Sequence, residues 1–165
     1  MKYNQIIQEK IWETEVLEEK LNELRAKKTN KIVFTNGCFD ILHLGHVDYL
    51  MKSADLGSDL IVGINTDESV RSLGKGNSRP IQDEVSRATI IASLQFVRAV
   101  VLFHENTPYE LIKRIQPDVL VKGADYKPKD IVGYDIVMAK GGIVSTIEFL
   151  PGYSTSLIEQ KIKKF

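Results

Sequence analysis

The chain has 165 residues, of which 43% are hydrophobic and 27% are charged, which indicates one globular domain and argues against a long disordered chain. Lys plus Arg and Asp plus Glu number 22 each, so the net charge is zero and no broad electrostatic field favours nucleic acid or an anionic membrane. The chain has a single cysteine, Cys38, which excludes an intrachain disulfide. Its apolar runs are too short to cross a membrane. We therefore expect a cytoplasmic protein without a secretory signal.

The first predicted element runs from about residue 4 to residue 28 and contains no Gly or Pro. Apolar residues recur in it at steps of three to six residues, which predicts one amphipathic helix. They are Ile7, Ile11, Leu17, Leu21 and Leu24. Because three clean heptads are absent, we favour packing of this stripe on its own domain over a coiled coil, although it could also join a homodimer interface. The sequence thus divides into an N-terminal helical extension, residues 1–30, and a main domain, residues 31–165.

After residue 30, five short runs rich in β-branched residues alternate with stretches typical of helices. The runs are 32–34, 60–64, 99–103, 119–121 and 143–147, and the helical stretches are 46–56, 84–96, 108–115, 130–140 and 154–163. Each run is continuous, as in strands that are buried on both faces of a parallel sheet. This alternation predicts an α/β fold with a doubly wound five-stranded parallel sheet. In such sheets ligands bind beyond the carboxyl ends of the strands.

The loop after the first run carries two histidines, His43 and His46, with Gly45 directly before the second and a helix following. A helix N-terminus collects unpaired N–H groups, and two imidazole donors beside it would hold phosphate oxygens. A metal pair and simple surface histidines are the alternatives, although the only other histidine, His104, lies in another loop. A P-loop and a Gly-x-Gly-x-x-Gly turn are absent, so a phosphate site here would be of another design.

The same loop carries the first of several motifs that resemble a known family. It reads Gly37, Cys38, Phe39 and Asp40, followed by His43, Leu44, Gly45 and His46. This order resembles the signature of the cytidylyltransferase-like nucleotidyltransferases, which are built on a Rossmann-like sheet. The resemblance implies that the two histidines of this HxGH motif are catalytic and that the residues around them bind nucleotide.

Two residues of this loop have further interpretations. We reject Cys38 as a nucleophile because the sequence assigns it no base, and we expect it to fit a tight turn. Asp40 is expected to order the loop or the substrate, with a place near Mg²⁺ as the alternative.

A second match lies near the C-terminus, directly before the last helix. It comprises Gly152, Tyr153, Ser154, Thr155 and Ser156. Ser and Thr before a helix are by themselves an ordinary cap. Together with the first motif, however, this segment resembles the family's Gly-x-Ser-Thr-Thr, which contacts nucleotide phosphate. Some family members have a basic residue just before this segment, where it contributes to phosphate binding. This chain has no basic residue at 149–151, so that contribution must come from another residue or be missing.

Between these motifs, residues 71–80 form a basic loop that contains glycines. Lys75 and Arg79 can bind anionic oxygens there, and a solvated surface loop is the alternative. The resemblance implies that Lys75 is catalytic and contacts substrate phosphate, with Arg79 as a helper. Arg87, in the next helix, matches a family arginine expected at the nucleotide site, but Val85 and Ser86 depart from the family pattern and leave its local partner open.

The fourth run leads into a segment that narrows the resemblance. It reads Val121, Lys122, Gly123, Ala124, Asp125 and Tyr126. This is similar to Val-Lys-Gly-Gly-Asp-Tyr in the sugar-phosphate adenylyltransferases that act on heptose 1-phosphate, and it implies nucleoside contacts by Lys122, Gly123 and Asp125. The resemblance covers about residues 31–163 and suggests the adenylyltransferase half of a bifunctional enzyme, standing alone.

The reaction that this resemblance implies is transfer of AMP from ATP, with Mg²⁺, to D-glycero-beta-D-manno-heptose 1-phosphate, giving ADP-heptose and pyrophosphate. The product would be a precursor of lipopolysaccharide or another surface glycan. One alternative is a CTP-dependent cytidylyltransferase that acts on glycerol 3-phosphate or a related alcohol phosphate. The other is a non-catalytic nucleotide-binding module that uses its first helix to dimerise.

Overall fold

The computed structural model describes residues 1–73 and 79–164. These residues form a parallel sheet of five strands in the order β3-β2-β1-β4-β5. The strands are β1 (Ile32–Gly37), β2 (Asp59–Asn65), β3 (Val97–Phe103), β4 (Val119–Gly123) and β5 (Ile143–Ile147). The chain order reverses between β1 and β4, and at such a switch point the loops leave in opposite directions and open a crevice at the carboxyl edge. The predicted α/β fold is therefore confirmed.

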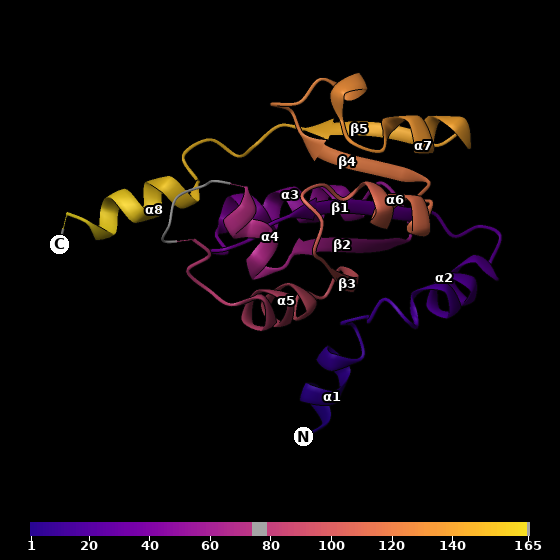
Figure 1. The fold of residues 1–165 in the computed structure, drawn as a ribbon, viewed down its shortest axis with the longest axis horizontal. Helices are drawn as coiled ribbons and strands as arrows, with labels where there is room; N and C mark the ends of the chain where they lie inside the picture. Colours follow the sequence, from indigo (N-terminus) through magenta and orange to yellow (C-terminus); the bar gives the residue numbers. More distant parts are fainter. Residues whose placement is uncertain (74–78, 165) are drawn as a thin grey trace.

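Helices cover the sheet and extend beyond it (Figure 1). They are α1 (Lys2–Gln8), α2 (Leu17–Arg25), α3 (Leu44–Ala54), α4 (Asp67–Ser72), α5 (Glu84–Ala92), α6 (Tyr109–Ile115), α7 (Tyr134–Ala139) and α8 (Thr155–Ile162), with a 3-10 turn η1 (Pro128–Asp130). Within the described part of the chain, no helix has the length and apolar character needed to span a bilayer.

Two hydrophobic clusters fill the opposite faces of the sheet. Neighbouring residues of β1 alternate between them, since Ile32 and Phe34 belong to one cluster and Val33 to the other. Helices α2, α6 and α7 contribute to the first cluster, whereas α3 and α5 contribute to the second. The central strands are thus buried on both faces, which is why their sequences are continuous apolar runs.

The N-terminal segment forms two helices, so the prediction of one continuous helix is wrong. The connection between α1 and α2 pairs with the outer edge of β3, where Trp12 N donates to Val100 O at 2.9 Å and Val100 N donates to Lys10 O at 2.8 Å. An edge strand has unpaired backbone groups, and pairing them here interrupts a segment whose composition alone favours a helix. The Lys10 ammonium also donates to the carbonyls of Ala92 and Leu94 at the end of α5.

The apolar stripe of this segment packs on its own chain, as predicted. Leu17, Leu21 and Leu24 are buried in the first hydrophobic cluster, beside residues of α6 and of the sheet.

Leu21→Ala should lower the free energy of unfolding by about 3 kcal/mol, because the side chain is fully buried and its removal leaves a cavity. Urea unfolding measures the loss. The matched control is Val16→Ala, since Val16 lies in the same segment and is exposed. Equal losses for the two variants would contradict packing of α2 into the core.

Candidate active site

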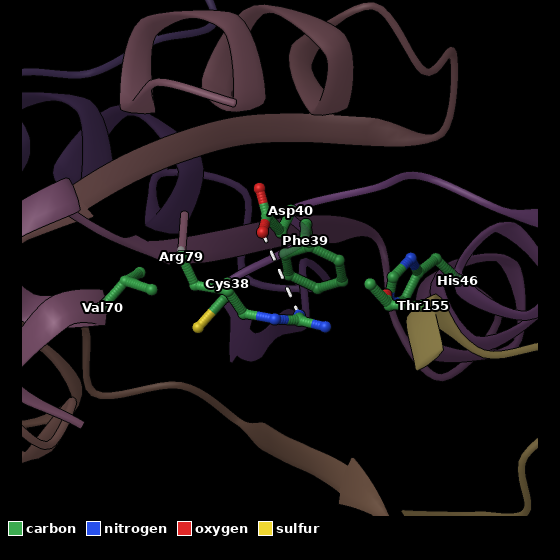
Figure 2. Close-up of a pocket in the computed structure, with 7 residues that line it drawn as sticks. All are labelled: Cys38, Phe39, Asp40, His46, Val70, Arg79 and Thr155. Carbon is green, nitrogen blue, oxygen red and sulfur yellow. Dashed lines mark ion pairs between the residues drawn. The ribbon is translucent and has the colours of Figure 1, made fainter. Parts of the chain in front are cut away.

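The carboxyl edge of the sheet opens onto a cavity of about 1050 Å³. Residues at or just after the carboxyl ends of all five strands line it, among them Cys38, Asn65, Asn106, Asp125 and Phe149. A smaller cavity of about 180 Å³, shown in Figure 2, has His46, Thr155 and Arg79 in its lining. In Figure 1, α8 lies beyond this edge of the sheet and α2 lies at the opposite end. The cavities therefore occupy the place that the doubly wound topology favours for ligands.

The two histidines lie together at the start of α3. His43 is the N-cap residue, and its Nδ1 accepts a hydrogen bond from His46 N at 3.3 Å. The two rings stack with their centroids 3.8 Å apart and an interplanar angle of 16°. Because Nδ1 of His43 accepts, the neutral ring carries its proton at Nε2 and can donate it to a ligand. This geometry favours the phosphate interpretation over surface histidines.

Both imidazoles are held in the neutral form. Burial and the neighbouring His43 lower the pKa of His46 to about 4, although the Ile41 carbonyl opposes the shift. Burial also lowers the pKa of His43 below its ordinary value. At neutral pH the pair therefore carries no positive charge, and the Nε2–H group of His43 can bind a phosphate oxygen by a directed hydrogen bond.

The turn after β1 is held from behind by Arg87. Phe39 has a φ of 50°, in the left-handed region that non-glycine residues rarely adopt. The fully buried Arg87 side chain donates to Cys38 O at 2.8 Å, to Gln82 O at 3.0 Å and to Asp67 Oδ1 at 2.7 Å. Asp67 is therefore the partner of Arg87 that could not be identified from the sequence. Three of the five guanidinium N–H donors of Arg87 thus bind within the protein and support the turn, and the nucleotide contact by Arg87 stays a prediction.

Asp40 ties the same turn to the segment that follows residue 78. Its buried carboxylate accepts from Ile81 N at 2.8 Å and from Gln82 N at 2.9 Å. Arg79 Nη1 lies 4.0 Å from Asp40 Oδ2. Of the two roles that the sequence left open, these contacts favour loop ordering over a place beside Mg²⁺. Among the described residues, no group of three His, Cys, Asp or Glu side chains is arranged to hold a metal ion.

The C-terminal motif lies next to the histidines. Ser154 caps α8, and its Oγ accepts from Leu157 N at 3.2 Å. A Cβ built on Gly45 would lie 3.1 Å from both Tyr153 Cβ and His43 Nδ1, so the glycine allows these two segments to approach closely. Thr155 lines both cavities. The starts of α3 and α8 therefore face one cavity from two sides.

The β4 end forms another wall of the larger cavity. Lys122 Nζ donates to Asn36 O at 3.3 Å and lies 5.7 Å from the centre of the Tyr126 ring. The Phe149 ring covers Gly123 so closely that a Cβ there would come within 2.1 Å of it. Phe149 and Tyr126 are both about half exposed in this wall. An aromatic wall of this kind suits a flat ring such as a nucleobase.

Most of the predicted site residues come together in the larger cavity. These are Gly37, Cys38, Phe39, His43, Gly45, His46, Lys122, Gly123, Asp125, Gly152, Tyr153, Ser154, Thr155 and Ser156. Asp40 and Arg79 line the smaller one, Arg87 lies behind the turn, and Lys75 lies outside the described residues.

Several residues that line the larger cavity were missed from the sequence, among them Phe149 and Asn36. Phe149 directly precedes the C-terminal motif, and its aromatic character beside a glycine turn was the available signal. Asn36 lies near the end of β1, and its buried Oδ1 makes no hydrogen bond within residues 1–73 and 79–164. No local sequence signal distinguishes such an oxygen from one that is paired inside the protein.

An open parallel sheet with two helix N-termini and a histidine pair at its switch point defines a class of α/β proteins that bind phosphate-bearing ligands. Within that class, the model of the family described as cytidylyltransferase-like matches residues 34–161, and the chain belongs to this family of nucleotidyltransferases.

Curated relatives include proteins named "Bifunctional protein HldE". The one from Campylobacter curvus is 54% identical over 140 residues, which are 85% of this chain and 29% of that protein. The one from Wolinella succinogenes is 51% identical over 156 residues, which are 94% of this chain and 32% of that protein. The chain thus spans less than a third of the length of these relatives.

Two solved structures resemble the fold. A lipopolysaccharide core biosynthesis protein from Thermoplasma volcanium has a TM-score of 0.59 and 31% identity, with 73% of this chain and 97% of that chain covered. A pantoate-beta-alanine ligase from Francisella tularensis has a TM-score of 0.57 and 14% identity, with 94% and 78% covered, and supports the fold alone.

The lowered pKa of His46 makes stability depend on pH. In the folded protein the group titrates near 4, and in the unfolded chain near its ordinary 6.5, so between these values the unfolded chain binds more protons. We expect the free energy of unfolding to fall as the pH drops through this window, and to fall less steeply in His46→Gln. Urea unfolding at a series of pH values tests this, and identical slopes would refute it.

Proposed function

We propose that this chain is an adenylyltransferase that transfers AMP from ATP to a sugar 1-phosphate, D-glycero-beta-D-manno-heptose 1-phosphate, and releases ADP-heptose and pyrophosphate in the cytoplasm. The observation that carries the proposal is the neutral His43 and His46 pair, which faces the same cavity as the cap of α8. The choice of substrates rests on the Val121–Tyr126 resemblance and on similarity to the bifunctional HldE proteins.

The chemistry needs no general base. A phosphate monoester has its second pKa near about 6, so the acceptor is largely ionised at neutral pH. One of its oxygens bonds to the α-phosphorus of ATP, while the bond from that phosphorus to the pyrophosphate oxygen breaks in line. The protein must align two anions and stabilise the charge that develops on the phosphate oxygens.

The two helix starts supply the donors for that task. Nε2 of His43 carries the proton because Nδ1 accepts, and it donates to an α- or β-phosphate oxygen. The imidazole of His46 is proposed to donate beside it. Backbone N–H groups at the start of α3 add to them. Ser154 and Thr155, at the start of α8, hold triphosphate oxygens from the other side. Lys75 is proposed to draw the two phosphates together, with Arg79 close to the triphosphate.

The nucleoside is proposed to lie against the β4 wall. Phe149 presents an exposed ring face above Gly123, and Asp125 offers carboxylate oxygens to nucleoside donors. When bound with ATP, Mg²⁺ would be held mostly by the triphosphate and would offset part of its negative charge. A homodimer stays a prediction from the sequence.

Pyrophosphate release with Mg²⁺ tests the substrates. ATP and CTP should each be combined with heptose 1-phosphate and with glycerol 3-phosphate. The proposal expects turnover with ATP and heptose 1-phosphate. Turnover with another pair would keep the class of reaction and replace the substrates, whereas ATP binding without release in any pair would favour a non-catalytic binding module.

His43→Ala and His46→Ala should each lower kcat by about a hundredfold, because each removes a donor aimed at the reacting phosphates. His104→Ala is the matched control, since His104 lies exposed in the loop after β3. Far-UV circular dichroism checks that the variants fold. Wild-type turnover in both histidine variants would contradict a catalytic role for His43 and His46.

A further inference from the structure

Helix α8 carries a predicted phosphate-binding cap but is only lightly embedded in the protein. None of its residues is buried, and Leu157 and Ile162 are exposed. Figure 1 shows it at the end of a long connection from β5, away from the sheet. Since burial of an apolar face is what usually fixes a helix, the position of α8 must depend on a few specific contacts.

Arg79 provides such a contact. Its Nη2 pairs with Glu159 Oε1 on α8, and its Nη1 faces Asp40 Oδ2 in the turn after β1. The side chains of Arg79 and Glu159 are 20% and 29% exposed, and that of Asp40 is 3% exposed. Partly buried ion pairs are screened by solvent less than surface pairs. The guanidinium thus joins α8 to the turn that precedes the histidines.

The position of Glu159 on α8 links this contact to the cap. Glu159 follows Thr155 by four residues, which places both on one face of the helix. Thr155, Arg79 and His46 line the smaller cavity. Figure 2 shows the Arg79 side chain extending across that cavity toward the side where His46 and Thr155 lie. The face of α8 that turns to the nucleotide site is therefore the face that Glu159 anchors.

The charges at this contact argue against a simple phosphate-binding arginine. One guanidinium faces two carboxylates, so the cluster of Asp40, Arg79 and Glu159 has a net charge of −1 when all three are ionised. The positive charge of Arg79 is already compensated within the protein. Its geometry suits a side chain that links α8 to the turn after β1 better than one that is free to bind phosphate.

We propose that Glu159 is a positioning residue for the nucleotide site: through Arg79 it holds α8 so that Ser154 and Thr155 face the histidine pair. This deepens the proposed function and rests on it. Glu159 itself touches no reacting atom, and its effect falls on the triphosphate rather than on the acceptor.

The test compares Glu159→Gln with wild type and with Glu148→Gln, a matched change at an exposed residue in the connection to α8. The first readout is amide hydrogen exchange in α8 of the ligand-free protein. Loss of the ion pair should speed exchange by about threefold or more, since the docking contact no longer opposes local opening.

The second readout is the Kd for MgATP by titration calorimetry, together with the KM for the acceptor. Glu159→Gln should weaken ATP binding by roughly tenfold and leave the acceptor KM within about twofold, because only the triphosphate contacts are misplaced. General destabilisation would instead lower kcat with both constants unchanged, and that pattern would refute the proposal.

Unchanged hydrogen exchange in α8 of Glu159→Gln would also refute the positioning role of Glu159. Tighter ATP binding by this variant would refute it too, because it would mean that Glu159 only competes with phosphate for Arg79. A wild type that binds no MgATP would refute the proposed function itself. Wild-type affinity retained in Glu159→Gln would refute the positioning role alone.

Discussion

The buried guanidinium of Arg87 is the contact on which the arrangement of the candidate site depends. It donates to the Cys38 and Gln82 carbonyls and pairs with Asp67, so it joins the ends of β1 and β2 to α5. The turn above it includes Phe39 with a positive φ, a conformation that surrounding contacts must maintain. Asp40 adds a second tie by accepting from Ile81 N and Gln82 N. A turn fixed in this way delivers the chain to His43 in one orientation.

Fixing this turn matters because nucleotidyl transfer depends on preorganised donors. The two imidazoles stack at the start of α3 and stay neutral, and His43 presents a directed Nε2–H group in a partly desolvated place. Donors that are already oriented need no rearrangement as charge develops on the phosphate oxygens. On the opposite side of the cavity, α8 buries no residue of its own, and Glu159 on this helix pairs with Arg79.

Local patterns in the sequence were sufficient for most of the fold. Continuous β-branched runs predicted all five strands, because strands buried on both faces leave that pattern. The N-terminal helix was predicted as one because composition favours a helix throughout, whereas pairing of Trp12 and Lys10 with the β3 edge is a tertiary effect. Helix α4 was missed, although Thr66 caps it and Asp67 and Glu68 fill its first turn.

The candidate site was predictable in its motifs but not in its supports. The loop after β1 and the Ser154 cap are contiguous in sequence, so their approach at the carboxyl edge followed from a parallel sheet. The partner of Arg87 is Asp67, which lies on another element and comes near only through the fold. The Phe149 ring over Gly123 is likewise a contact between distant segments. Such contacts depend on side-chain packing that no local pattern encodes.

Direct transfer between two aligned anions is tested most directly by the stereochemistry at the α-phosphorus. The measurement uses ATP that carries sulfur at the α-phosphate in one configuration, with heptose 1-phosphate as the acceptor proposed above, and determines the configuration of the ADP-heptose analogue that forms. A single in-line displacement predicts inversion. Retention would require a covalent intermediate on the protein, with a residue such as His43 or Cys38 as nucleophile, and would contradict transfer by alignment alone.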